Sequence, residues 1–335
     1  MTESRPILAV TMGDPAGIGP EIAVRAASRS FLIGDARVFQ HALSVCGLTA
    51  RLNLVAGPEA LADQPGVIDM IHQQTADPAV LRVGEVQALG GEAAFASIKA
   101  SIELAMAGRI DGVATTPINK ESLKAAKIPF IGHTEMFAEF TGAADEMTMF
   151  TISGLKIFFL TRHVSLMEAC RQITQERVAK GIDKCLHALG QLGIARPHLA
   201  VAALNPHGGE DGLFGREEIE AIKPAIAAAR ARGMQVSGPV PADSVFHMAR
   251  IGRYDAVLSL YHDQGHIAAK MMDFEKTVSV TLGLPILRTS VDHGTAFDIA
   301  GTGKASAVSM IEAIKVAAEY AVRGVKLGET AHAAE

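Results

Sequence analysis

The sequence predicts an α/β protein whose mainly parallel sheet is covered by helices on both faces. Short apolar runs recur along the chain and alternate with stretches of helical spacing, which is the pattern of a doubly wound sheet. Several of these runs, including residues 112–115 and 256–260, end in polar segments. Because ligands bind at the carboxyl ends of the strands in such sheets, we expect a functional site along that edge.

The first predicted strand, Pro6 to Met12, is continuous and apolar at its centre, as a buried strand should be. The turn Gly13 to Glu21 leads from it into a helix that extends to about Ser28. A glycine-rich turn before a helix can hold an anion. Its glycine order matches neither the dinucleotide fingerprint nor the P-loop, so a tight structural turn is the alternative.

The remaining elements follow from the same periodicities, and Gly238 to Asp243 is interpreted as a loop that places one carboxylate. The expected elements are a strand at Leu52–Val55, a helix at Ala93–Ala107, a strand at Gly112–Thr115, a helix opened by Gly132–Glu135 with Phe137 and Phe140 toward the core, a hairpin over Met149–Leu160, and strands at Leu199–Leu204 and Ala256–Leu260.

Composition narrows the class of protein. The 335 residues are enough for two domains, and 49% hydrophobic with 20% charged residues indicates a globular chain. A net charge of -5 without a basic block argues against nucleic acid or an anionic membrane as partner. The 3 scattered cysteines argue against a disulfide framework. We found neither a signal peptide nor a membrane-spanning run, so we expect a cytoplasmic protein.

Three histidines follow predicted strands: His163, His207 and His262. Neutral imidazoles suit zinc, copper, iron or nickel, and three protein ligands leave a position for substrate. Any one histidine is more often an ordinary hydrogen-bonding side chain. The long separations along the chain do not show that the three converge, so the metal site is a hypothesis.

Cationic and imidazole side chains suggest an anion site. His133 and Thr134 stand near a predicted helix N-terminus, where phosphate or carboxylate is favoured, although Thr134 as a helix cap is the alternative. Lys270 and Arg288 suit the same groups, or are solvated surface charges.

Two carboxylates are candidates for proton transfer. Asp243 or Asp263 could accept the proton of a substrate hydroxyl or orient a metal-ligating histidine. A capping or surface role is the alternative for each, because short carboxylates are also common turn residues.

Taken together, these segments resemble the 4-hydroxythreonine-4-phosphate dehydrogenase family of vitamin B6 biosynthesis. Asp292 to Gly301 also resembles the adenine-side loop of isopropylmalate and isocitrate dehydrogenases, which share that fold. The matching stretches are Gly13–Glu21, Gly132–Glu135, Thr161–His163, Asn205–Glu210, Pro241–Asp243, Tyr261–Gly265 and Thr281–Gly301.

The resemblance implies a homodimer of two α/β domains with an active site in the cleft between them and a divalent metal shared across the dimer. By it, residues 1–125 and 285–335 form a nucleotide-side domain, and 126–284 form the metal, substrate and dimerisation domain. The implied site residues are His163, His207 and His262 for the metal (Zn, Mg, Co or Ni); His133, Thr134, Lys270, Ser279 and Arg288 for substrate; Lys270, Asp243 and Asp263 for catalysis; and His293, Gly294, Thr295, Ala296, Asp298 and Gly301 for NAD or NADP.

The implied reaction is NAD-dependent oxidation of a 4-phosphorylated 3-hydroxy acid, with decarboxylation of the keto product. Among the possible substrates, the resemblance favours 4-phosphohydroxythreonine, the substrate of vitamin B6 biosynthesis. Two positions depart from that pattern: Ser279 replaces an Asn, and His266 is more like a sister branch that acts on 4-phosphothreonate or 4-phosphoerythronate. A metal-dependent hydrolase or aldolase, and a sugar-acid-binding protein without chemistry, are the alternatives.

Overall fold

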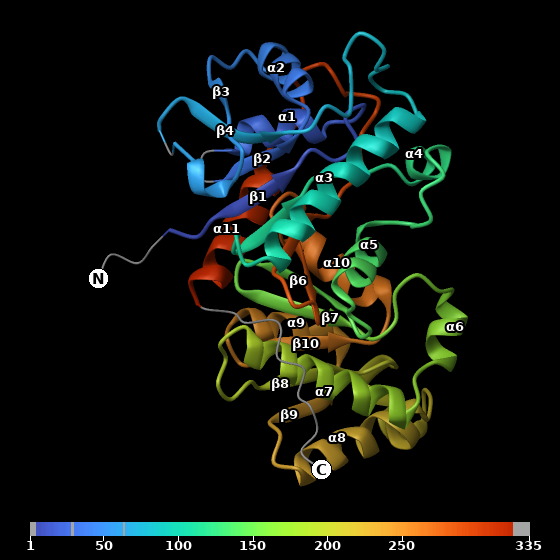
Figure 1. The fold of residues 1–335 in the computed structure, drawn as a ribbon. Helices are drawn as coiled ribbons and strands as arrows, with labels where there is room; N and C mark the ends of the chain where they lie inside the picture. Colours follow the sequence, from blue (N-terminus) through green and yellow to red (C-terminus); the bar gives the residue numbers. More distant parts are fainter. Residues whose placement is uncertain (1–4, 28–29, 63, 324–335) are drawn as a thin grey trace. The chain divides into compact units, whose positions relative to one another are not determined.

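The computed structural model describes residues 5–27, 30–62 and 64–323, and the chain divides into two compact units (Figure 1). Unit 1 combines Met1–Glu146 with Gly283–Glu335, and unit 2 is Met147–Leu282. The first boundary thus lies at residue 146, later than the expected 125. The reason is packing: Met136 and Phe137 are fully buried in the core of unit 1, which holds their helix there.

Unit 1 contains a sheet in the order β3-β4-β2-β1-β5-β12, in which every neighbouring pair is parallel. Its core strands are buried along their whole length, as expected of continuous apolar runs. The strands are β1 (Leu8–Thr11), β2 (Phe31–Gly34), β3 (Arg51–Leu54), β4 (Val67–His72), β5 (Gly112–Thr115) and β12 (Arg288–Val291).

Helices cover both faces of this sheet, as the doubly wound pattern predicts (Figure 1). One group, α3 to α5, packs together, and α1, α2 and α11 form the other group. Their bounds are α1 (Gly19–Ala26), α2 (Ala36–Val45), α3 (Ala88–Met106), α4 (Lys120–Ala125), α5 (His133–Thr141) and α11 (Val308–Val322).

The turn between β1 and α1 is closed by protein contacts. The backbone N–H groups of Ala16 and Gly17 donate to Asp14, and that of Ile18 donates to the Thr295 carbonyl. Asp14 is fully buried, and this burial raises the pKa of its carboxyl. Engaged N–H groups beside a buried acid favour the structural-turn interpretation over an anion cradle.

Unit 2 contains a mixed sheet in the order β11-β6-β7-β10-β8-β9. The expected hairpin is present as the antiparallel pair β6–β7, and β11 is antiparallel to β6. From β7 onward the pairs are parallel. The strands are β6 (Met147–Ile152), β7 (Leu155–Phe159), β8 (Leu199–Ala202), β9 (Val236–Val240), β10 (Ala256–Ser259) and β11 (Val278–Leu282).

In unit 2, α7 and α8 pack together on the sheet, and α9 and α10 pack with a separate aromatic and aliphatic core. The segment Gly238–Asp243 is not the expected loop: β9 continues through Val240 and α9 begins at Ala242. The helices are α6 (Leu166–Arg171), α7 (Gln175–Gln191), α8 (Lys223–Ala231), α9 (Ala242–Arg250) and α10 (His262–Met272), with short turns at Pro206–Gly212 and Glu218–Ile222.

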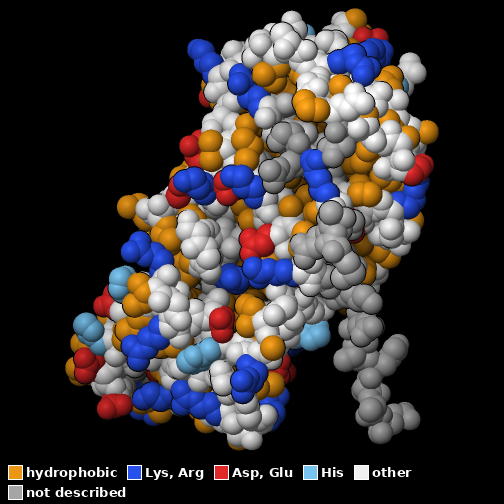
Figure 2. Space-filling model, turned by 90° about the vertical axis from the view of Figure 1, so that its left-hand side faces the viewer, with side chains coloured by type: hydrophobic (Ala, Val, Ile, Leu, Met, Phe, Trp, Pro, Cys, Tyr) orange, Lys and Arg blue, Asp and Glu red, His pale blue; other side chains and the backbone are white. Residues whose placement is uncertain are grey.

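The described surface carries charges of both signs. On the face drawn in Figure 2, Lys and Arg side chains are scattered among acidic and hydrophobic ones. None of the helices in the described ranges is long and apolar enough to cross a bilayer.

Close packing under α10 fixes where that helix begins. A Cβ on Gly265 would lie 2.6 Å from the Phe159 ring, 2.7 Å from Ser259 Oγ and 2.8 Å from Ile157. Only glycine therefore lets the first turn of α10 lie directly on β7 and β10. His262, the first residue of α10, takes its position from this contact.

Gly265→Ala should lower the free energy of unfolding by about 1–3 kcal/mol, because the new methyl group overpacks a tight contact. Gly190→Ala is the matched control, since a methyl group on Gly190, in α7, would have no atom within 4 Å outside its own helix turn. That change should be neutral or stabilising by up to about 1 kcal/mol. Urea denaturation of both variants measures the difference, and equal shifts would contradict the packing argument.

Candidate functional site

Three neighbouring strands of unit 2 bring the expected metal ligands to one edge. Strands β7, β10 and β8 are adjacent and parallel, so the segments that carry His163, His262 and His207 leave from the same side. The strand ends are also joined: Thr161 Oγ1 donates to the Leu260 carbonyl at 2.8 Å.

Gln264 joins the second pair of strand ends. Its Nε2 donates to the Ala203 carbonyl after β8 at 2.7 Å, and its Oε1 accepts from Leu260 N after β10 at 2.7 Å. The side chain is buried, so both bonds are shielded from water.

His163 and His262 face one another closely enough to share a ligand. Their ring centroids are 6.0 Å apart. Two imidazoles that bind one ion at about 2 Å have centroids about 5–6.5 Å apart. His262 Nδ1 lies 2.6 Å from Asp263 Oδ1, and an ionised carboxylate only accepts, so Nδ1 carries the hydrogen. That contact leaves Nε2 as the ring nitrogen of His262 with a lone pair for a metal ion.

His266 supports the His262 ring from one side. The two rings stack with centroids 3.6 Å apart and planes inclined by 10°. Phe150 and Phe159 pack against His266 at centroid distances of 4.5 and 4.4 Å. His266 Nδ1 also lies 2.9 Å from the His262 carbonyl oxygen. The two phenyl rings and this polar contact therefore hold the His266 ring in place against the ring of His262.

His207 occupies an unusual backbone conformation. It is exposed, and residues 207–211 all have positive φ, with His207 at 54°. Within the described ranges of this one chain, no three His, Cys, Asp or Glu side chains converge to hold a metal ion. The donor chemistry of the pair His163 and His262 nevertheless fits a divalent metal of the zinc type.

Unit 1 contains a buried cation next to an imidazole. Arg288, at the start of β12, is 5% exposed. Its Nη2 donates to Thr115 Oγ1 at 3.0 Å, and its guanidinium lies 5.3 Å from the centre of the Phe137 ring. Burial lowers the pKa of Arg288 to about 9, so the side chain stays charged at neutral pH. The solvated-surface interpretation of Arg288 is therefore wrong.

His133 opens α5 beside that cation. Burial, and then the charge of Arg288, hold the pKa of His133 well below its ordinary value, so the ring is neutral. Its Nε2 is buried without a hydrogen-bond partner. Thr134 is not the helix cap: Gly132 occupies the cap position, and no side chain caps the helix.

The other expected substrate and catalytic residues lie in unit 2. Lys270 Nζ is 5.0 Å from the centre of the Phe274 ring. Ser279 is half-buried on β11, opposite Phe150 of β6. Asp243 is exposed in the first turn of α9. The structure thus places His133 beside Arg288 in unit 1 and His163 beside His262 in unit 2, whereas His207 does not complete a group of three with that pair of rings in the described part of the chain.

The expected cofactor loop follows β12 in unit 1. His293 is anchored by Ser309, with Nε2 and Oγ 2.8 Å apart. Thr295 is buried, Ala296 has φ of 41°, and Asp298 is exposed. Gly294 and Gly301 are exposed as well. The first part of the loop is therefore anchored through His293, and the carboxylate of Asp298 further along is accessible to solvent.

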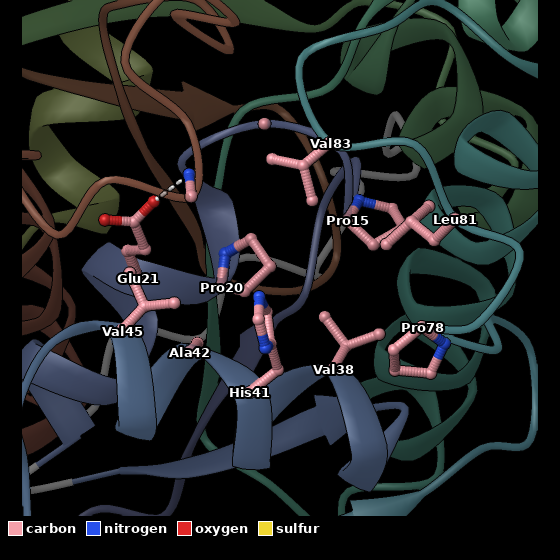
Figure 3. Close-up of a pocket in the computed structure, with 12 residues that line it drawn as sticks. Pro15, Pro20, Glu21, Val38, His41, Ala42, Val45, Pro78, Leu81 and Val83 are labelled. Carbon is pink, nitrogen blue, oxygen red and sulfur yellow. Dashed lines mark hydrogen bonds between the residues drawn. The ribbon is translucent and has the colours of Figure 1, made fainter.

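A small pocket borders the end of this loop. Figure 3 shows Glu21 accepting the backbone N–H of Gly301, at 2.6 Å, beside apolar walls that include Pro20 and Val38. The cavity has a volume of about 120 Å³ and lies beyond the carboxyl ends of β1, β2 and β4. The N–H of Gly301 is thus occupied by the protein itself.

Sequence reasoning missed three contributors. Thr115 was seen only as part of a strand, Gln264 only as part of a polar motif, and Glu218 not at all. Glu218 is 1% exposed, and its carboxylate accepts from the backbone before His207. The adjacent pair Glu217 and Glu218 near a histidine-bearing glycine-rich segment is the only signal that could have drawn attention to it.

Comparison with known proteins gives consistent matches along the chain. The family model described as "Pyridoxal phosphate biosynthetic protein PdxA" matches residues 26–317. A Symbiobacterium thermophilum protein named "Putative D-threonate 4-phosphate dehydrogenase" is 60% identical over 327 residues, covering 95% of this chain and 98% of the relative. A protein of the same name from Halalkalibacterium halodurans is 54% identical and covers 95% and 97%.

Solved structures agree with these matches. A 4-hydroxythreonine-4-phosphate dehydrogenase from Klebsiella pneumoniae is 41% identical, has a TM-score of 0.88, and covers 96% of this chain and 99% of its own. One from Burkholderia phymatum is 39% identical with a TM-score of 0.83, covering 94% and 98%. The predicted resemblance is confirmed, and the chain belongs to the PdxA family of dehydrogenases.

Proposed function

We propose that this protein is an NAD-dependent, metal-dependent dehydrogenase of D-threonate 4-phosphate. The observation that carries the proposal is the 60% identity, along nearly the whole of both chains, to a relative of that name. The solved 4-hydroxythreonine-4-phosphate dehydrogenases are 39–41% identical. The biosynthetic substrate expected first therefore gives way to 4-phosphothreonate, the substrate of the sister branch, and 4-phosphoerythronate is a second candidate of the same class.

The anionic end of the substrate is assigned to Arg288 and His133. A buried guanidinium can form charge-assisted hydrogen bonds with phosphate or carboxylate, and low local polarity strengthens them. The neutral His133 can supply a further hydrogen bond through Nε2. Lys270, Thr134 and Ser279 are assigned to the remaining polar groups of the substrate.

The metal is assigned to His163, His207 and His262. When bound, a divalent ion would supply a Lewis acid that increases the acidity of the reacting hydroxyl. Asp263 accepts the hydrogen of His262 Nδ1, which would leave Nε2 to bind the metal. Asp243 is the candidate acceptor of the hydroxyl proton, and the cationic Lys270 is the candidate for stabilising the negative charge that develops when a 3-keto acid subsequently loses CO₂.

The nicotinamide cofactor is assigned to the loop His293–Gly301. Asp298 is exposed there, and a carboxylate suits the two ribose hydroxyls of NAD while repelling the 2′-phosphate of NADP. This favours NAD as the cofactor.

A second copy of the chain is the proposed partner. Ile267 and Met271 are 61% and 81% exposed and lie one helical turn apart on α10, and Phe274, which is 60% exposed, lies in the turn that follows the helix. An apolar stripe on the helix that begins with a metal ligand suits a dimer interface beside the site. Such an interface would let two chains share one metal, as expected from the family resemblance.

The first test is substrate preference. We expect kcat/KM for D-threonate 4-phosphate to exceed that for 4-phosphohydroxythreonine by about tenfold or more, a transition-state difference of about 1.4 kcal/mol. NADH absorbance measures both, with D-erythronate 4-phosphate as a third substrate. A higher value for 4-phosphohydroxythreonine would reverse the assignment.

The second test concerns the anion site. Arg288→Gln should lower kcat/KM about 10- to 100-fold, because a charge-assisted hydrogen bond contributes about 1.5–3 kcal/mol. Arg323→Gln is the control, since Arg323 forms a surface ion pair with Glu319. Thermal melting of both variants separates lost binding from lost folding, and a folded Arg288→Gln enzyme with unchanged kcat/KM would remove Arg288 from the site.

The third test concerns the metal. EDTA should abolish turnover, with recovery on adding Zn²⁺, Co²⁺, Ni²⁺ or Mg²⁺. His207→Ala should abolish turnover and reduce bound metal in elemental analysis, whereas the exposed His187→Ala should change neither. Full metal content in a folded His207→Ala protein would exclude His207 as a ligand.

A further inference from the structure

The segment Leu204–Gly215, here called the His207 segment, contains a strained backbone. His207, Glu210 and Asp211 are not glycines, yet their φ values are 54°, 44° and 51°. The left-handed conformation costs an L-residue about 1–2 kcal/mol. Such residues persist only where surrounding contacts over-determine the backbone. Something must therefore hold this segment in place.

Glu218 provides that hold. Its Oε1 accepts from Leu204 N at 2.8 Å and from Asn205 N at 2.7 Å. Its Oε2 accepts from Asn205 Nδ2 at 2.9 Å. The carboxylate is 1% exposed, and hydrogen bonds to a buried charged group are stronger than neutral ones. Both oxygens of the Glu218 carboxylate thus accept hydrogen bonds from Leu204 and Asn205, the two residues that begin the segment.

The glycines of the segment are packed around the same network. A Cβ on Gly209, which has φ of 83°, would lie 2.8 Å from Glu218 Oε2. A Cβ on Gly215 would collide with Asn205 Nδ2. Phe214 N also donates to the Gly209 carbonyl at 3.2 Å, which closes the segment on itself. The backbone therefore wraps directly over the carboxylate of Glu218.

We propose that Glu218 is the positioning residue for His207: it fixes the strained segment in the single conformation from which the exposed imidazole binds metal. This inference rests on the proposed metal role of His207. Glu218 touches neither metal nor substrate in this assignment and acts through Leu204 and Asn205. It holds His207 as Asp263 holds His262, but through the backbone instead of the ring.

Glu218→Gln tests the proposal with almost no change in volume. A glutamine amide has only one acceptor oxygen. Its NH₂ group would replace the other carboxylate oxygen and would therefore face an N–H donor that now donates to Glu218. Glu220→Gln is the matched control, because Glu220 lies two residues further on and forms a surface ion pair with exposed Arg216. Apo protein is titrated with Co²⁺, which reports binding by its visible spectrum, and amide hydrogen exchange is followed across the His207 segment.

We expect Glu218→Gln to bind Co²⁺ about 10- to 100-fold more weakly, the range found when groups that orient metal ligands are removed. Exchange should accelerate within the His207 segment while β8 and β10 keep their protection. Glu220→Gln should match the wild type in both measurements. Unchanged Co²⁺ affinity together with unchanged exchange would overturn the proposal.

Two comparisons separate this inference from the proposed function. If His207→Ala leaves Co²⁺ affinity unchanged, the assignment of His207 as a metal ligand fails. Faster exchange in Glu218→Gln would then show that Glu218 restrains the His207 segment, without a role in metal binding. If Glu218→Gln does not fold, Asn205→Ala is measured in the same way; it removes the side-chain bond to Glu218, together with the bond from the same Nδ2 to Glu217. A folded Asn205→Ala protein with wild-type affinity and exchange would also count against the proposal.

Discussion

Hydrogen bonds between neighbouring strand ends are the constraint on which the unit 2 site depends. A parallel sheet aligns the carboxyl ends of β7, β10 and β8, but it does not by itself fix the segments that follow. Thr161 and Gln264 do so by bonding the residues just after one strand to those just after the next. Because both side chains are buried, the loops begin from a rigid platform.

The proposed ligands are held on that platform in two different ways. His262 lies in the first turn of a helix, where the stacked His266 ring and the Asp263 carboxylate restrict its orientation. His207 lies in a segment without regular structure, where Glu218 restricts the backbone. The first arrangement adds contacts to an already favourable conformation. The second uses a buried charge to maintain an unfavourable one, so it should be the more sensitive of the two to substitution.

Local periodicity predicted most of the fold because it records which residues are buried. The apolar runs of β1, β5, β8 and β10 were placed to within a residue or two. The unit boundary was not, because the assignment of α5 to unit 1 depends on Met136 and Phe137 packing against a core that local sequence does not reveal. Residues 238–243 are not the predicted loop, because β9 accommodates Gly238 and Pro239 and α9 begins at Ala242.

The candidate site shows where such prediction ends, and Arg288 illustrates the physical reason. Residue type alone gives a cation, and cations are usually exposed. Its place at the start of a central strand, between Thr115 and the face of Phe137, buries it. Burial disfavours the charged form of Arg288 and strengthens the electric field around it. The burial of His133, and then the nearby charge of Arg288, lower the pKa of His133 and keep that ring neutral. In the proposed anion site, a buried positive charge therefore stands beside a neutral imidazole, and only the three-dimensional packing gives the two side chains this combination.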